Sequence, residues 1–174
     1  MKGRFELITR EQPADTFTVL SFRGREEVSK PFAFRIRVRA AGLDLETELG
    51  GAPAVLAIHA ASGSRTIAGL LTSARLESVL ASGEGAVYRV KLVPRLAALA
   101  HTQNSRIFQD RTVPQIVTAI LDEHHIDHTW KARRSYPPRP YAVQYRESDL
   151  GFVERLLAEE DRKSTRLNSS HRLT

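Results

Sequence analysis

The sequence predicts an α+β protein that is mainly β, with a barrel-like antiparallel β domain followed by amphipathic helices. Two observations lead to this fold class. Over roughly the first 95 residues, short runs of alternating apolar and polar side chains are separated by turn residues, which is typical of antiparallel strands. After Pro94 the apolar spacing changes from two residues to three and four, which is typical of helices that bury one face.

The strand pattern is clearest in FAFRIRVR at residues 32–39. One face is aromatic and aliphatic and the other is largely arginine: Phe32, Phe34, Ile36 and Val38 against Ala33, Arg35, Arg37 and Arg39. This period of two predicts a strand with one buried face. The preceding run, TFTVLSFR at residues 16–23, is apolar on both sides, with Phe17 opposed to Leu20, and predicts a strand covered on both faces.

Later runs in the first half predict successive antiparallel hairpins. VLAIHA and TIAGLLTSARLESV flank the turn-like ASGSR at residues 61–65, and VYRVKLV follows the glycine-containing ASGEGA at residues 81–86. Short turns between regular strands favour a barrel or a strongly curved sheet. A short helix is expected at residues 43–51, LDLETELGG.

Two amphipathic helices are predicted in the second half, at residues 112–124 and 148–160. In the first, Thr112 and Gln115 have capping-box spacing and Pro114 lies in the first turn. The apolar face of this helix is Val113, Ile116, Val117, Ile120 and Leu121. The second helix begins at Ser148 with Asp149 in its first turn, and its apolar face is Phe152, Val153, Leu156 and Leu157.

The pattern divides the chain into three parts. Residues 1–95 form a β-rich, barrel-like domain, and residues 96–160 form an α+β segment in which YPPRPYAVQYRE, residues 136–147, is an extended lead into a strand. Residues 161–174, beginning DRKSTRLNSSH, offer almost nothing to bury and predict a solvated, disordered tail. No internal repeat is present.

The composition predicts a soluble globular protein. The chain has 174 residues, of which 41% are hydrophobic, which is enough for one ordinary domain or slightly more. The absence of cysteine excludes a disulfide scaffold, a thiolate metal site and a cysteine nucleophile. The sequence contains no secretory signal and no run of about 18 apolar residues, so we expect synthesis in the cytoplasm and no membrane-spanning segment.

The net charge of +6 raises the possibility of a polyanionic partner. Four of these charges lie in residues 162–174, which hold Arg162, Lys163, Arg166 and Arg172 and no acid, so +2 remains for residues 1–161. Arg35, Arg37 and Arg39, and separately Arg133 and Arg134 before SYPPRPY, are the candidate basic patches. Solvated faces or a protein interface explain them better than nucleic acid, for which the electrostatic signal is weak.

A histidine-rich run, DEHHIDH at residues 122–128, is the candidate metal site. Its possible ligands are His124, His125, His128, Glu123 and Asp127. Zincins need two histidines four residues apart with glutamate after the first, and His125 stands there instead. The simpler interpretation is imidazoles that complement the carbonyls and dipole at a helix C-terminus.

Catalytic motifs are missing from the sequence. It contains no G-x-S-x-G elbow, no Walker A loop and no G-x-G-x-x-G. The paired acids Glu26 and Glu27, and Glu159 and Glu160, are interpreted as solvated surface carboxylates. We therefore assign no catalytic, cofactor-binding or metal-binding residue and expect no enzyme activity.

Three long stretches resemble the N-terminal part of the valine-glycine-repeat (VgrG) spike proteins of the bacterial type VI secretion system, relatives of the hub of contractile phage tails. They are FTVLSFRGREEVSKPFAFRIRV at 17–38, SRIFQDRTVPQIVTAIL at 105–121 and YPPRPYAVQYRESDLGFVERLLAEE at 136–160, in the family's order. The resemblance implies a non-enzymatic, homotrimeric hub of barrel-like β domains with inserted helices, without cofactors. It also implies a ring-forming tube protein, a baseplate and effector proteins as partners, and export through the type VI apparatus.

The tail departs from this resemblance, because a family member is expected to continue through more hub, a neck and a needle. DRKSTRLNSSH is similar to the translation of a common sequencing-library adapter, so we expect a truncated front fragment whose last helix has lost its cover. The alternative is a small basic module that binds nucleic acid or another anion, with residues 161–174 as an arm. Genomic DNA across codon 160 would distinguish the two.

Overall fold

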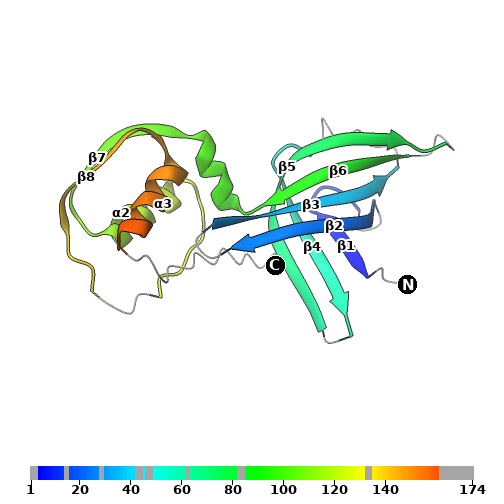
Figure 1. Cartoon of the computed structure of the whole chain (residues 1–174), viewed down its shortest axis with the longest axis horizontal. Helices are drawn as coiled ribbons and strands as arrows, with labels where there is room; N and C mark the ends of the chain where they lie inside the picture. Colours follow the sequence, from blue (N-terminus) through cyan, green and yellow to red (C-terminus); the bar gives the residue numbers. More distant parts are fainter. Residues whose placement is uncertain are drawn as a thin grey trace. The chain divides into compact units, whose positions relative to one another are not determined.

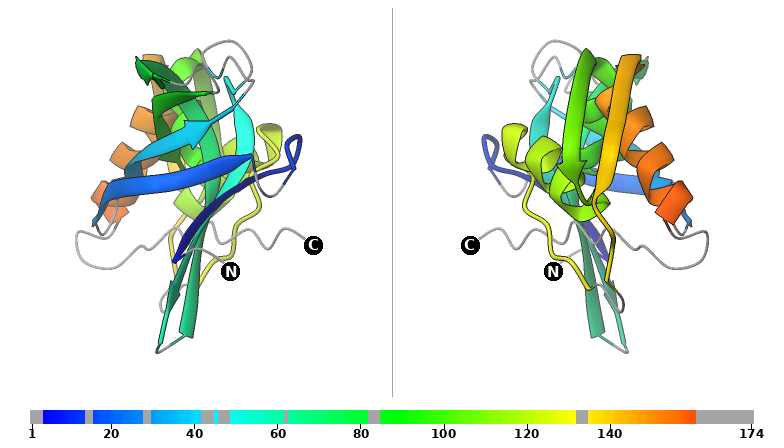
Figure 2. Two further views of the ribbon diagram at one scale, coloured as in Figure 1. Left: turned by 90° about the vertical axis from the view of Figure 1, so that its right-hand side faces the viewer. Right: turned by 90° about the vertical axis from the view of Figure 1, so that its left-hand side faces the viewer.

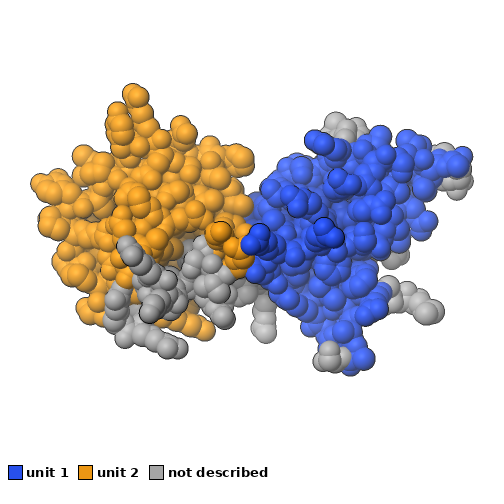
Figure 3. Space-filling model, viewed as in Figure 1, with its two compact units in different colours: residues 1–26, 32–94, 170–174 blue, residues 27–31, 95–169 orange. Residues whose placement is uncertain are grey.

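The computed structural model describes residues 4–13, 16–27, 30–41, 45, 49–61, 63–81, 85–131 and 135–160. These belong to two compact units (Figure 3). The first comprises the described parts of residues 1–26 and 32–94, and the second those of residues 27–31 and 95–160. The predicted tail at 161–174 and most of the predicted helix at 43–51 lie outside the described residues.

The first unit is a curled six-stranded sheet (Figure 1). Its strands are β1 (Phe5–Thr9), β2 (Phe17–Glu27), β3 (Lys30–Ala40), β4 (Ala52–Ala60), β5 (Gly63–Val79) and β6 (Ala86–Val93). They are ordered β1-β4-β5-β6-β3-β2, and the pairs β1 with β4, β4 with β5, β5 with β6 and β6 with β3 are antiparallel. The predicted mainly β, barrel-like fold is confirmed, and the sheet has the form of a half-barrel. The predicted hairpins are the pairs β4 with β5 and β5 with β6.

The long strand β5 produces much of the curl, because its first half pairs with β4 and its second half with β6. The register shifts between Leu71 and Ser73 and again between Leu76 and Ser78, and such bulges increase strand twist. Gly69 lies where β5 changes partner, and a Cβ atom there would be 2.2 Å from the Val93 carbonyl oxygen. Only glycine allows this close backbone approach.

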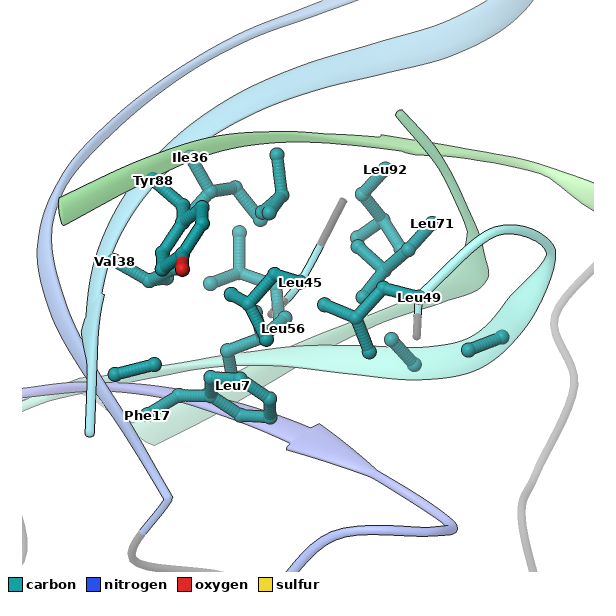
Figure 4. Packing of buried hydrophobic residues seen from close by; sticks show 14 of the residues in the cluster. Leu7, Phe17, Ile36, Val38, Leu45, Leu49, Leu56, Leu71, Tyr88 and Leu92 are labelled. Atoms are coloured by element: carbon teal, nitrogen blue, oxygen red, sulfur yellow. The ribbon is translucent and has the colours of Figure 1, made fainter. Parts of the chain in front are cut away.

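The interior of the half-barrel is filled by side chains from its strands and from the segment between β3 and β4. Figure 4 shows Leu7 from β1, Leu56 from β4 and Tyr88 from β6 converging on one interior, together with Leu45 and Leu49. The predicted alternation in β3 is confirmed, since Phe34, Ile36 and Val38 are buried and its arginines are exposed.

Strand β2 corrects one expectation. It was predicted to be covered on both faces, but it is an edge strand and Leu20 is 44% exposed. The two edge strands meet through side chains: the rings of Phe5 in β1 and Phe22 in β2 lie edge to face with centroids 5.1 Å apart. Among the described residues no backbone hydrogen bonds pair β1 with β2. Apolar side chains of β2, such as Phe22, therefore make the contact between the two edges of the half-barrel.

The second unit contains a two-stranded sheet and two α-helices. Its elements are the 3-10 helix η1 (Arg95–His101), β7 (Gln103–Arg111), α2 (Val113–Glu123), β8 (Arg139–Ser148) and α3 (Asp149–Glu160). The strands are antiparallel neighbours, and the right-hand view of Figure 2 shows them side by side in front of the helices. The sequence pattern missed η1 and β7.

Both predicted helices are confirmed to within a residue or two at each end. The capping box of α2 is complete: the Gln115 amide donates to Thr112 Oγ1 at 3.3 Å, and the Thr112 amide donates to Gln115 Oε1 at 2.9 Å. The Gly151 amide donates to Ser148 Oγ at 3.1 Å at the start of α3. The apolar face predicted for α2 is fully buried.

The expectation that α3 has lost its cover is wrong. Phe152, Val153 and Leu156 are each 0% exposed, because they pack against α2, η1 and the sheet within this unit. The Phe152 ring stacks on Phe108 of β7 with centroids 5.9 Å apart. The second unit therefore has a core of its own: its buried residues come from η1, α2, β8, α3 and the segment after α2, and Phe108 of β7 packs against them.

Candidate protein interface

A buried carboxylate fixes the two-stranded sheet to the helices. Asp149, the first residue of α3, is 0% exposed. It accepts hydrogen bonds from Arg106 Nη2 at 2.6 Å and Gln144 Nε2 at 2.7 Å. Asn104 Nδ2 lies 3.0 Å and His124 Nε2 2.8 Å from the same carboxylate. One side chain thus connects β7, β8, α2 and α3.

This arrangement keeps Asp149 ionised. Burial opposes the charge, but the hydrogen bonds from Gln144, Asn104, Arg106 and His124 outweigh it and lower the pKa of Asp149 from 3.8 to about 2. Arg106 also pairs with Glu123 of α2 at 2.5 Å, and its pKa is raised although burial alone would lower it. The network is a structural anchor, since each of its residues has a partner within the protein.

The anchor decides which face of the sheet points inward. Arg106, Gln144 and Asn104 must face the helices to reach Asp149, and Phe108 and Ala142 share that side with them. Because successive side chains on a strand alternate between faces, the intervening residues must point outward. We call their exposed side the outer ribbon face: Ser105, Ile107 and Gln109 of β7, and Tyr141, Val143 and Tyr145 of β8.

The outer ribbon face is apolar at its centre and carries no charge among these six residues. Ile107 lies directly opposite Val143, and the two are 63% and 46% exposed. Tyr141 and Tyr145 flank them and are 66% and 68% exposed. In a chain with 26% charged residues, an exposed sheet face made only of Tyr, Ile, Val, Ser and Gln is unusual. Tyrosine enrichment and depletion of charge are typical of the centre of protein interfaces.

Arg146 borders this face at a bulge. Its backbone has a positive φ of 47°, its amide donates to Ser105 Oγ at 3.2 Å, and its guanidinium lies 5.5 Å from the centre of the Tyr145 ring. A cation over an aromatic ring at the edge of an apolar patch resembles the polar rim that surrounds interface centres. The face offers mainly exposed aromatic and aliphatic area.

The histidine run is dispersed by the fold. His124 contacts Asp149, whereas His128 Nε2 lies 3.1 Å from Thr118 Oγ1 and His128 Nδ1 lies 3.0 Å from the Ile126 carbonyl oxygen. The interpretation that His124 complements helix-end carbonyls is wrong, because its ring is used by the buried carboxylate. In the part of the chain that the structure describes, no three acidic or histidine side chains gather as metal ligands.

Two of the paired acids, Glu26 and Glu159, are exposed as expected, and all four also form ion pairs. Glu159 Oε2 and Glu160 Oε1 each lie 2.5 Å from Arg139, which ties the end of α3 to β8. Glu26 pairs with Arg65 at 2.6 Å and Glu27 with Lys30 at 3.2 Å. Arg133 and Arg134 lie outside the described residues.

Sequence reasoning missed both Asp149 as an anchor and the outer ribbon face. In β8 the larger apolar residues Tyr141, Val143 and Tyr145 are exposed, while Ala142 and Gln144 are buried, which is the reverse of what period-two alternation indicates. A usable signal was the spacing of polar residues, since Gln144 interrupts the apolar run of β8 and Asp149 follows directly after that strand. No helix within the described ranges is long and apolar enough to cross a membrane.

Comparison with known proteins points to one family. A family model described as phage tail baseplate hub (GPD) matches residues 25–163. The type VI secretion system spike protein VgrG4b of Pseudomonas aeruginosa is 44% identical over 151 residues, which are 82% of this chain and 18% of that protein. The actin cross-linking toxin VgrG1 of Vibrio cholerae is 47% identical over 74 residues, 42% of this chain and 7% of the toxin.

Solved structures agree. A type VI secretion component of Escherichia coli, the c3393 protein, described as similar to the phage T4 tail proteins gp27 and gp5, is 33% identical with a TM-score of 0.74. The match covers 88% of this chain and 43% of that one. The 43 kDa tail protein of prophage MuSo2 from Shewanella oneidensis has the same fold, with a TM-score of 0.60 at 12% identity over 89% of this chain and 49% of that one. The chain spans about a fifth of the length of the curated spike proteins that it matches.

Proposed function

Because this chain belongs to the phage tail baseplate hub family, whose model matches residues 25–163, we propose that it is a structural hub and spike component of a bacterial type VI secretion machine. The observation that carries this proposal is the likeness to the E. coli secretion component, which combines 33% identity with a TM-score of 0.74 over 88% of the chain. The sequence identity to the P. aeruginosa spike protein supports the same proposal without any use of the structure.

The role of this region is mechanical and not catalytic. Its polar networks at Asp149, Arg139 and Glu77 are closed by internal partners, which supports a role in rigidity. The V. cholerae toxin shares only 7% of its length with this chain, which supports assigning its named activity to another part of that protein. A nucleic-acid-binding module, the alternative raised by the net charge, has no support from the family or from the relatives named above.

This chain supplies two domains of the hub. Residues 1–95 form the β domain and residues 96–160 form the helix-containing domain, while most of residues 161–174 lie beyond the region that the hub family model matches, which ends at residue 163. The protein is made in the cytoplasm, assembles as a homotrimer on a ring-forming tube protein within the baseplate, carries effector proteins and leaves through the secretion apparatus. The names of its family and relatives support the baseplate hub, the spike and the secretion in this proposal.

The outer ribbon face contacts a second copy of the chain in that trimer. An uncharged face with two tyrosines more than 60% exposed is poorly suited to remain in water, and a self-assembling hub offers an identical partner at every copy. Such aromatic residues are the usual anchors of interfaces.

A chimera tests the function. The matched region of the P. aeruginosa spike protein is replaced by residues 5–160 of this chain, and the chimera is expressed in a strain that lacks that spike. We expect a trimer by light scattering and restored secretion. A chimera that folds but stays monomeric and fails to secrete would contradict the proposed function.

Variants of the same chimera test the interface. Tyr141→Thr with Tyr145→Thr should shift the trimer toward monomer by about tenfold or more, because it removes two aromatic anchors and retains β propensity. Val79→Thr, at a position that is 66% exposed on the half-barrel, is the matched control and should leave the trimer intact. Equal behaviour of the two variants would exclude the outer ribbon face from the contact.

A further inference from the structure

The outward side of the half-barrel carries a dense cluster of cations. Strands β3, β6 and β5 are neighbours in the sheet, and their apolar residues fill the interior, so the intervening residues point outward. On this side lie Arg35, Arg37 and Arg39 of β3, Arg89 and Lys91 of β6, and Arg75 of β5, all exposed. We call these six residues the basic face.

The strand register places these cations side by side. In the strand register Arg75 of β5 lies opposite Arg89 of β6, and Arg89 lies opposite Arg37 of β3. Three arginines therefore form one row across three strands. Lys91 lies opposite Arg35 in the next row. Directly opposed residues in antiparallel strands have Cβ atoms about 5 Å apart, and like charges at that distance destabilise the sheet. Repulsion between these cations therefore lowers the stability of the sheet in the free protein.

One carboxylate already lies among the cations. Glu77, at the bulge of β5, accepts a hydrogen bond from Arg37 Nε at 2.7 Å and also forms an ion pair with Arg89. The hydrogen bond from Arg37, with the charges of Arg37 and Arg89, lowers the pKa of Glu77 against a smaller opposing effect of burial. Arg37 and Arg89, two of the six cations, therefore already have a carboxylate partner, Glu77, on a neighbouring strand.

The other four cations have no such partner within the described residues: Arg35, Arg39, Arg75 and Lys91. We propose that the basic face is a docking surface for a carboxylate-rich surface of another protein. Charge complementarity selects this partner, and Glu77 shows that the spacing of the cross-strand rows suits a carboxylate. Arginine pairs carboxylates through its planar fork, and five of the six cations are arginine.

Nucleic acid fits this surface less well. Proteins that bind single strands place aromatic side chains between the cations so that bases can stack. No aromatic residue stands at the outward positions that the rows define, and Glu77 at their centre would repel phosphates. This proposal concerns a different surface from the outer ribbon face and does not depend on trimer formation, so either can fail without the other.

Binding of labelled poly-L-glutamate to the full 174-residue chain tests the proposal. Arg35→Glu with Arg75→Glu is compared with Arg10→Glu with Arg95→Glu, which changes the net charge equally at exposed positions outside the basic face. We expect the first pair to weaken poly-L-glutamate binding about tenfold or more and the second less than about threefold, because close charges contribute most. Thermal unfolding of each variant confirms that it is folded.

A third variant predicts a change in the opposite direction. Glu77→Gln frees Arg37 and Arg89, so it should strengthen poly-L-glutamate binding by about threefold or more while lowering the thermal midpoint. A residue with only a structural role would not strengthen binding. Equal losses for the two double variants would overturn the proposal. So would duplex DNA that binds the unaltered chain more tightly than poly-L-glutamate and competes for the same residues.

Discussion

Asp149 is the residue on which the second unit depends. A carboxylate that is 0% exposed is tolerated because four side chains from other elements donate to it. Removing such a partner leaves buried donors unsatisfied, which costs more than the hydrogen bonds themselves contribute. We expect Asp149→Asn to lower the free energy of unfolding by about 3 kcal/mol at neutral pH, measured by urea denaturation. Glu154→Gln, at an exposed position on the same helix, is the control and should change it by less than about 0.5 kcal/mol.

Asp149 also predicts a pH dependence. Its pKa is lowered in the folded protein, so its contribution is complete above the ordinary value of 3.8 and is lost as the pH falls through about 2. The shift corresponds to about 2 kcal/mol. Urea denaturation between pH 5 and about 2 should show this loss in the unaltered chain and a smaller one in Asp149→Asn. Parallel pH profiles would contradict the assignment.

Gly24 is required by its neighbour and not by its backbone angles. A Cβ atom at this position would lie 2.0 Å from ring atoms of Phe34, which is buried in the half-barrel. Gly24→Ala should therefore destabilise the protein by about 1–3 kcal/mol through overpacking. At Gly50 a Cβ would meet nothing within 4 Å, so Gly50→Ala should be nearly neutral in the same thermal unfolding experiment. Equal effects would show that Phe34 adjusts freely.

At the scale of elements, β8 shows how an anchor can override hydrophobic alternation. Its buried side holds Ala142 and Gln144, and its exposed side holds the larger apolar residues. The strand keeps this orientation because Gln144 donates to Asp149 at 2.7 Å and because Arg139 pairs with Glu159 and Glu160 of α3. The larger apolar residues of β8 are thereby left exposed.

This orientation predicts that the outer ribbon face contributes little to folding. Tyr141→Thr with Tyr145→Thr should change the free energy of unfolding of the 174-residue chain by less than about 1 kcal/mol, since both residues are mostly exposed. Phe152→Ala, which empties a 0% exposed site in the same unit, should cost about 3–5 kcal/mol. Chemical denaturation with circular dichroism measures both. A large loss for the tyrosine variant would mean that these rings pack within the chain.

At the scale of the whole molecule, each unit has a complete core, but the chain spans only about a fifth of the length of the curated spike proteins. We expect the 174-residue chain to be folded and predominantly monomeric, with a mass near 19.5 kDa by light scattering, and not to restore secretion in a spike-deletion strain. Holding three copies together needs interface area beyond one small exposed face. A uniform trimer from this chain alone, with restored secretion, would contradict this expectation.

The sequence by itself determined the features that depend on neighbouring residues. Alternation fixed the buried face of β3, the spacing of three and four fixed the apolar face of α2, and the capping box fixed where α2 begins. These signals are readable because strand pleat, helix period and capping each act over a few residues. The fold class followed from them, and the division of residues 1–160 into two domains stays a prediction.

Only the tertiary structure decided which strand lies at the edge of the sheet and which face of β8 is buried. The position of β2 depends on pairing across the whole first unit, and Asp149 draws its partners from residues up to 45 positions away. The row of Arg75, Arg89 and Arg37 likewise exists only in the register of three strands. Burial and pairing are set by such distant contacts, which local periodicity does not contain.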